Sequence, residues 1–181
     1  MNCGFAFEHE ISKGKDLGIH LTKISTPRFG RSIYDFFGVY LGIPIALECK
    51  ATRTATCFAF NRVEDHQVTA LLDMHSNGGK AYILINIRQG KSQEAYALSI
   101  LEYNRLREVY GTINRKSIPL EVIRKLPKLV KVSGAWDIRP LFTKEVYNET
   151  TAITDATATS KRPRTKTDIN EGIKSKNTGS K

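Results

Sequence analysis

Two apolar stretches on either side of Leu41-Gly42 constrain the fold more than any other part of the chain. The stretches "YDFFGVY" (34–40) and "IPIALECK" (43–50) have the composition of strands. The two residues between them are typical of a β-hairpin turn. A two-residue turn pairs Tyr40 with Ile43, and this pairing sets which residues of the two strands lie opposite each other.

Asp35 and Glu48 are brought together by this register. Continuing outward from the turn places them directly opposite each other on one face of the sheet, with Cβ atoms about 4.5–5.5 Å apart. Side chains alternate along a strand, so Lys50 lies on the same face and Cys49 on the other. A slip of one residue would separate the two carboxylates. Because two carboxylates this close repel each other, the hairpin predicts a bound proton or cation between them.

A magnesium ion suits this predicted pair of carboxylates. Mg²⁺ takes oxygen ligands and is usually held by one or two carboxylates together with waters and substrate phosphates. Lys50 can stabilise charge on a phosphate or orient an attacking water. Asp followed, after a spacer, by Glu-x-Lys is the arrangement of metal-dependent nucleases. The alternative is a surface aspartate beside an exposed Glu–Lys ion pair without a function.

The net charge of +10 is not confined to one end of the chain. Residues 151–181 contain seven Lys or Arg and three Asp or Glu, which accounts for +4 and leaves +6 for residues 1–150. A body that is basic in its own right predicts a polyanionic partner. Nucleic acid is the first expectation and an anionic membrane surface the second.

Cysteine usage and hydropathy indicate a cytoplasmic protein. The chain has three cysteines, and no two of them have CxxC spacing. Reduced thiols are therefore expected, rather than disulfides or a zinc site. No apolar run approaches the ~20 residues of a membrane span. The N-terminal residues do not form a secretory signal either.

The pattern along the chain predicts one domain over residues 1–147 and a disordered basic tail over 148–181, which is rich in Thr, Ser, Lys and Asn. Helices and strands alternate irregularly, so we expect a mixed α/β fold with a central mixed sheet flanked by helices. The expected helices are near 4–14, 63–77, 100–111 and just after Pro119, and the expected strands are 34–40, 43–50, 80–88 and 94–100. Residues 19–33 are expected to be extended, and 51–60 to form a basic loop.

The centre of the sequence resembles a known family. Residues 35–67, from "DFFGVY" through "ALECKAT" to "DHQ", and "NGGKAYILINI" (77–87) resemble the RecU-type Holliday junction resolvases of the PD-(D/E)xK nuclease superfamily. That family has an Asp strand leading into "GVY", an E-x-K strand with a Thr close behind and a Phe-containing loop. A His-Gln pair that opens a helix and a Gly-Gly before an apolar strand complete the pattern. All of these occur here in order, and the resemblance covers roughly residues 3–147.

The resemblance implies a restriction-endonuclease-like core and a Mg²⁺-dependent endonuclease, with Mn²⁺ as a substitute. The enzyme would resolve four-way DNA junctions by paired symmetric nicks, and it would act as a homodimer in a bacterial cell or as a phage protein. Glu8, in the first helix, then joins Asp35 and Glu48 as a metal ligand. Lys50 and Gln67 are the further catalytic residues. Glu10 is an alternative to Glu8, since only one of the two can face the site.

DNA contacts are expected in two places. The family inserts a long stalk before the Asp strand to grip the junction centre, and here only about residues 20–33 can take that part. Lys23, Arg28 and Arg31 are the candidates there, and Thr52 and Arg53 are candidates beside the metal edge. Two other functions stay open: a restriction-like or repair nuclease of the same superfamily, and a noncatalytic DNA-binding module.

Overall fold

A computed structural model of the chain describes residues 3–24, 32–54, 56–90 and 92–142. The predicted tail (148–181) lies outside these residues, as do the predicted domain boundary at 147 and the candidate DNA contacts Arg28 and Arg31. None of the helices in the described ranges is long and apolar enough to cross a membrane.

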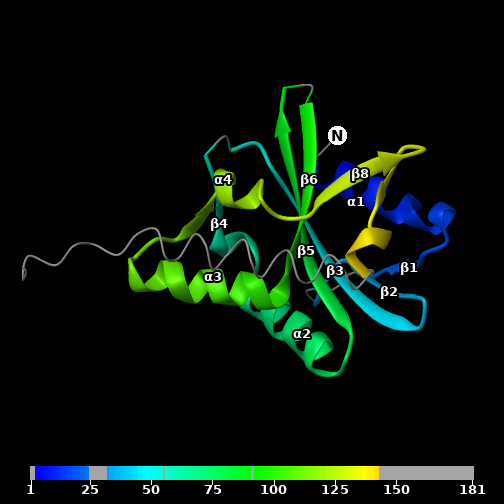
Figure 1. Cartoon of the computed structure of the whole chain (residues 1–181), viewed down its shortest axis with the longest axis horizontal. Helices are drawn as coiled ribbons and strands as arrows, with labels where there is room; N and C mark the ends of the chain where they lie inside the picture. Colours follow the sequence, from blue (N-terminus) through cyan, green and yellow to red (C-terminus); the bar gives the residue numbers. More distant parts are fainter. Residues whose placement is uncertain (1–2, 25–31, 55, 91, 143–181) are drawn as a thin grey trace, which may run out of the picture.

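A seven-stranded mixed sheet forms the centre of the molecule (Figure 1), in the order β1-β2-β3-β5-β6-β8-β9. Strands β3 and β5 run parallel, and the other described neighbours in this sheet run antiparallel. The expected α/β class with a central mixed sheet is confirmed. The strands are β1 (His20–Lys23), β2 (Phe36–Tyr40), β3 (Ile43–Thr52), β5 (Lys80–Gln89), β6 (Ser92–Ser99), β8 (Lys128–Val132) and β9 (Ala135–Asp137).

Helices cover both faces of this sheet (Figure 1). Helix α1 (Cys3–Ser12) packs on one face, where its Phe7 and Ile11 are buried against alternate residues of β3 and β5. Helices α2 (Asp65–Ser76) and α3 (Ile100–Thr112) pack on the other face, against the remaining residues of the same strands. The sheet therefore separates two apolar cores. Shorter helical segments are η1 (Lys13–Leu17), η2 (Phe60–Arg62), α4 (Leu120–Ile123) and η3 (Arg139–Phe142).

The hairpin forms with the predicted register. Tyr40 pairs with Ile43, and the ladder runs in step to Phe36 opposite Leu47. Leu41 and Gly42 both have positive φ angles, of 50° and 79°, as a two-residue turn with the twist of the flanking strands requires. From the turn back to Phe36, the first residue of β2, the residues of the two strands therefore pair as the sequence predicted.

Gly38 has a packing reason to be glycine. It pairs with Leu21 of β1, and a Cβ at this position would lie 2.1 Å from the backbone oxygen of His20. A backbone oxygen cannot move away as a flexible side chain can. The "GVY" sequence therefore lets β1 dock closely on the outer side of the hairpin.

Some elements were not expected from the sequence. The segment 51–60, expected as a loop, contains the end of β3 and the short strand β4 (Cys57–Ala59), which pairs with β7 (Ser117–Pro119) in a second sheet. The chain after 127 forms the hairpin β8–β9. Strands of three residues give too short a pattern to be read, and β4 and β7 depend on partners about 60 residues apart.

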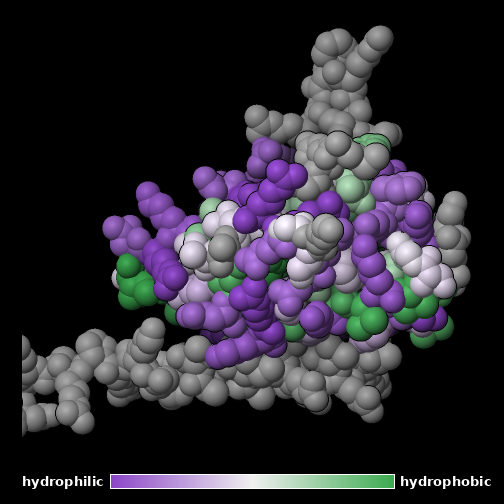
Figure 2. All heavy atoms as spheres, turned by 90° about the horizontal axis from the view of Figure 1, so that it is seen from above, coloured by the Kyte–Doolittle hydropathy of each residue, from purple (hydrophilic) through white to green (hydrophobic). Residues whose placement is uncertain are grey.

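Hydrophilic side chains dominate the middle of the face shown in Figure 2, and apolar ones are confined to patches at its sides. The exposed apolar residues with the largest exposed fractions include Leu41 at the hairpin turn, at 80%.

Candidate active site

Glu48 lies in the middle of β3 and is almost completely buried, with 1% of its surface exposed. One carboxylate oxygen, Oε1, accepts a hydrogen bond from Gln67 Nε2 at 2.8 Å and lies 2.6 Å from Lys50 Nζ. The other, Oε2, is buried and has no hydrogen-bond partner in the described part of the chain. A buried carboxylate oxygen without a partner is costly, so Oε2 indicates a position for a ligand.

Gln67 is brought to this carboxylate by the start of α2. It is the third helical residue, and its Oε1 accepts a hydrogen bond from the backbone N–H of Glu64 at 3.1 Å, as in a capping box. The same Oε1 accepts from Lys50 Nζ at 3.2 Å. With its oxygen occupied by two donors, the amide directs Nε2 at Glu48. The position of Gln67 is thus fixed by both the helix terminus and β3.

Asp35 lies one residue before β2 and is held against the edge of β3. Its backbone N–H donates to the Leu47 oxygen at 3.0 Å, and its Oδ2 accepts from the backbone N–H of Cys49 at 2.7 Å. The regular alternation stops here, because Tyr34 packs in the core under α2 and α3 whereas Phe36 packs in the core under α1. Both aromatic residues are buried, but on opposite faces of the sheet.

Both carboxylates have a raised pKa, and burial is the main cause for each. Burial raises the pKa of Glu48 from 4.5 to about 7, and the neighbouring charge of Asp35 adds to this effect. Burial also raises the pKa of Asp35, against the lowering effect of the Cys49 N–H. A bound cation would favour the charged forms of both groups.

These residues fit a hard divalent cation. Glu48 supplies a free oxygen, and Asp35 supplies a second carboxylate whose pKa is raised by the same burial. Within the described residues, no three His, Cys, Asp or Glu side chains are grouped closely enough to hold an ion. Two carboxylates completed by water and substrate oxygens are the usual environment of Mg²⁺, so the arrangement suits Mg²⁺ better than zinc.

Glu8 and Glu10, the two alternatives that helix periodicity leaves open, are held by different partners. Glu10 accepts hydrogen bonds from Trp136 Nε1 at 2.8 Å and from Lys131 Nζ at 2.9 Å, so it is held toward β8 and β9. Glu8 instead pairs with Lys23 Nζ at 2.7 Å, and its charge contributes to the raised pKa of Asp35. These contacts favour Glu8 over Glu10 as the residue near Asp35, and the assignment of Glu8 as a metal ligand stays a prediction.

The candidate DNA contacts within the described residues differ in how far they are exposed to solvent. Lys23 is half-exposed, pairs with Glu8 and lies 5.2 Å from the centre of the Phe5 ring. Arg53 is exposed. Thr52 is only 2% exposed and its hydroxyl accepts a bond from the Thr54 N–H, which does not suit the expected contact with a phosphate. The sequence pattern predicts a loop over 51–60, in which Thr52 would be accessible, but Thr52 is the last residue of β3.

Arg62 is a residue of this region that sequence reasoning missed. It follows β4, lies over the Phe58 ring at 5.9 Å and donates to the backbone oxygen of Ala51 at 2.6 Å. Ala51 lies in β3 beyond the end of β2, where no strand of the described part of the chain pairs with this edge. Nothing in the local sequence pairs residue 62 with residue 51, so only the folded chain reveals the contact.

The family model described as recombination protein U matches residues 18–141. This chain belongs to that family. The Holliday junction resolvase RecU of Staphylococcus carnosus (strain TM300) is 32% identical over 94 residues, which cover 52% of this chain and 44% of that protein. The enzyme of the same name from Staphylococcus aureus (strain JH9) is 31% identical over the same length.

The chain thus spans less than half the length of these RecU relatives in the matched region. Among solved structures, it is similar to Archaeoglobus fulgidus Hjc, a Holliday junction resolvase from an archaeal hyperthermophile, with 14% identity and a TM-score of 0.39. That match covers 54% of this chain and 73% of the archaeal one. The family match extends over β1 to β9 and includes Asp35, Glu48 and Gln67.

Proposed function

We propose that this chain is a Mg²⁺-dependent endonuclease that resolves four-way DNA junctions by paired nicks. The observation that carries the proposal is the buried Oε2 of Glu48, which has no partner among the described residues and lies beside a second carboxylate, Asp35. The family match and the net charge of +6 over residues 1–150 support a DNA substrate. The proposed place of action is the cytoplasm of a bacterial cell or of a phage-infected one.

Each side chain has a distinct part in the proposed reaction. Glu48 Oε2 and Asp35 would hold the metal ion, and Glu8 of α1, which here pairs with Lys23, would be the third carboxylate near it. When bound, the ion lowers the pKa of a water and stabilises negative charge on the phosphate. Lys50 and Gln67 keep Glu48 Oε1 in place, which directs Oε2 away from them. Lys50 also offers a cation to the scissile phosphate.

Two symmetric nicks require two active sites, so we also propose a two-fold homodimer. A restriction-like or repair nuclease without junction preference, and a DNA-binding module without activity, are the competing functions. A junction resolvase cuts the four-way junction preferentially, the other nucleases cut without junction preference, and the DNA-binding module cuts no DNA.

Cleavage of a four-way junction, a linear duplex and a flapped duplex of equal length tests the proposal, with and without Mg²⁺. We expect the junction to be cut fastest, only with the metal, and Glu48→Gln to reduce the rate at least about 100-fold while junction binding persists. Equal cutting of all three DNAs would favour the restriction-like or repair nuclease. Binding without cutting at any Mg²⁺ concentration would favour the DNA-binding module.

A further inference from the structure

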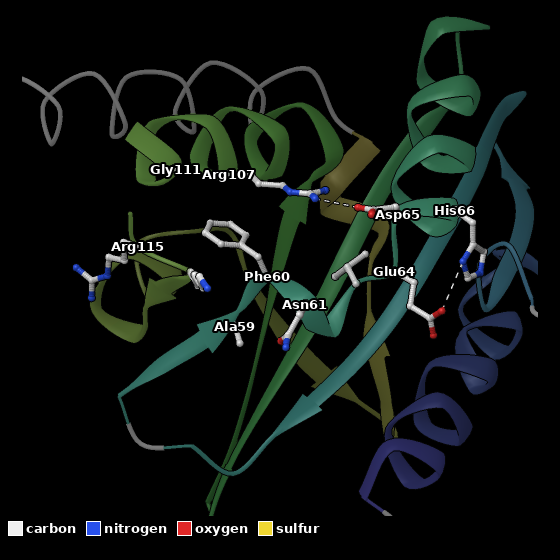
Figure 3. Close-up of a pocket in the computed structure, with 11 residues that line it drawn as sticks. Ala59, Phe60, Asn61, Glu64, Asp65, His66, Arg107, Gly111 and Arg115 are labelled. Carbon is white, nitrogen blue, oxygen red and sulfur yellow. Dashed lines mark hydrogen bonds and ion pairs between the residues drawn. The ribbon is translucent and has the colours of Figure 1, made fainter. Parts of the chain in front are cut away.

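A groove of about 740 Å³ lies next to the candidate active site and takes no part in the chemistry described so far (Figure 3). One wall is formed by α3 and the turn after it, and the other by η2 and the start of α2. Its floor is apolar and includes Phe60 and Val63. Its volume lies in the range of pockets that hold ligands.

Two cations stand at one end of the groove on fixed backbone. Arg115 donates its N–H to the Tyr110 oxygen at 2.9 Å, and its guanidinium lies 5.4 Å from the centre of the Tyr110 ring. The preceding residue, Asn114, has a φ of 54°, which turns the chain back over the end of α3. Lys116 is fixed by its backbone oxygen, which accepts from the Phe60 N–H at 3.0 Å. Both side chains are exposed, and their backbone positions are set before any ligand binds.

The acidic residues of the groove lie at its other end, where Asp65 faces a cation and Glu64 lies beside a histidine. Asp65 pairs with Arg107 at 2.9 Å, an ion pair that joins α2 to α3 (dashed in Figure 3). Glu64 lies 3.6 Å from His66 Nδ1. The charge along the groove is therefore graded, and its positive end is at Arg115 and Lys116, which form no ion pair within the described ranges. A ligand with negative charge at one end and apolar parts behind it suits this gradient.

The groove shares a wall with the candidate active site. The backbone N–H of Glu64, which lines the groove, donates to Gln67 Oε1, and Gln67 Nε2 donates to Glu48. A single turn of α2 therefore separates the groove from the carboxylate pair. A strand that leaves the active site along this wall would enter the groove at its acidic end and reach the two cations at the other.

We propose that this groove holds a DNA strand on its way from the active site, with phosphates on Arg115 and Lys116 and sugar or base atoms over Phe60 and Val63. The proposal rests on the proposed function and adds a strand-binding subsite to it. Phosphate contacts of this kind position DNA without reading its sequence. Apolar and aromatic surfaces that take sugars and bases are equally independent of sequence.

Binding of a four-way junction in EDTA, measured by fluorescence anisotropy at several salt concentrations, tests the groove apart from cutting. The test variant is Arg115→Ala with Lys116→Ala, and the matched control is Lys125→Ala with Lys128→Ala. The control removes the same charge from exposed residues outside the groove. Arg115→Gln with Lys116→Gln keeps the side-chain stems and serves as a second test variant if the alanine variant melts at a lower temperature.

We expect the groove variant to bind about tenfold more weakly for each lost contact at ~0.1 M salt, and the salt slope to fall by about 1.8. The control should keep the wild-type slope. If the groove variant and the control lose the same affinity for the junction, or neither loses any, the groove proposal is wrong. The proposed function is unaffected by this result as long as the wild-type protein cuts the junction. If only the groove variant binds the junction more weakly, and the wild-type protein does not cut DNA with Mg²⁺, the strand-binding subsite is supported and the nuclease function is refuted.

Discussion

Asp35 caps the backbone N–H of Cys49 at 2.7 Å, just beyond the point where β2 stops covering the edge of β3. This bond holds the aspartate beside Glu48, although Asp35 itself lies outside the strand ladder. Cys49 points its own side chain into the core under α1, as strand alternation predicted. A backbone amide thus positions one carboxylate of the pair, and the side chains of Lys50 and Gln67 position the other.

The metal-free protein should lose stability as pH rises through neutrality. Glu48 has a pKa of about 7 when folded and 4.5 as its ordinary value, so the folded state binds more protons between these values. Stability therefore falls with increasing pH, and the contribution present below pH 4.5 is lost above pH 7. The loss is on the order of 3 kcal/mol. Urea unfolding in EDTA from pH 5 to 8 measures it.

The control for this pH dependence is Glu48→Gln, which has no proton to lose at this position. Its unfolding free energy should change much less over the same range, and Mg²⁺ should stabilise the wild type at pH 8 but not the variant. A wild-type protein that becomes more stable from pH 5 to 8 in EDTA would contradict the assigned burial of Glu48.

Gln67→Ala should damage both the fold and the reaction. It removes the donor to Glu48 and the partner of the Glu64 N–H, which should cost about 1–3 kcal/mol of unfolding free energy. Cleavage should fall further than stability explains, because Lys50 loses the amide that holds it. Denaturation and cleavage rates of Gln67→Ala, Glu48→Gln and the double variant measure the coupling. Additive effects in the double variant would show that the amide and the carboxylate act independently.

Glu8 and Glu10 provide a matched pair two residues apart on α1. Glu8→Gln should lower the cleavage rate at limiting Mg²⁺ with little change in stability, since the partner of Glu8 among the described residues is a half-exposed lysine. Glu10→Gln should cost about 0.5–1.5 kcal/mol, because it weakens the bonds from Trp136 and Lys131, and should leave cleavage unchanged. Thermal melts and Mg²⁺ titrations of cleavage separate the two. If Glu10→Gln lowers the cleavage rate and Glu8→Gln lowers only the stability, Glu10 is the residue near the metal.

Arg28 and Arg31 lie outside the described residues, and their contact with the junction centre remains a prediction from the sequence. Replacing both with Ala should weaken junction binding more than binding to a duplex of equal length, and lower the salt slope by about one for each lost contact. Titration of both DNAs at two salt concentrations measures this. An equal loss on the two DNAs would make the segment a general phosphate contact.

The hairpin and its register could be predicted from the sequence because turn length and the strand pleat are both local. The register from Phe36 to Tyr40 followed from the Leu41-Gly42 turn alone. What could not be predicted depends on distant partners. Helix periodicity cannot choose between Glu8 and Glu10 when the deciding donor, Trp136, is 126 residues away in the chain.

The sequence also could not predict that Asp35 lies outside the strand ladder. A continuous strand would put Tyr34 and Phe36 on one face of the sheet. They are buried on opposite faces, because the backbone changes direction at the aspartate. The burial of Thr52 and the strand β4 are not predicted for a related reason. A Thr-rich stretch has the composition of a loop, but Thr52 pairs with Ile87 of β5 and β4 pairs with β7.

The end of β2 at Phe36 leaves the following half of β3 as an edge in the described residues, and two side chains occupy that edge: Asp35 on the Cys49 N–H and Arg62 on the Ala51 oxygen. Open strand edges invite pairing with strands of other molecules, which leads to aggregation. Asp35 occupies one donor and Arg62 one acceptor of this edge, so these two backbone groups are not available to another strand. In the proposed function, these two side chains would leave β3 accessible to DNA while they disfavour pairing with a strand of a second copy of the protein.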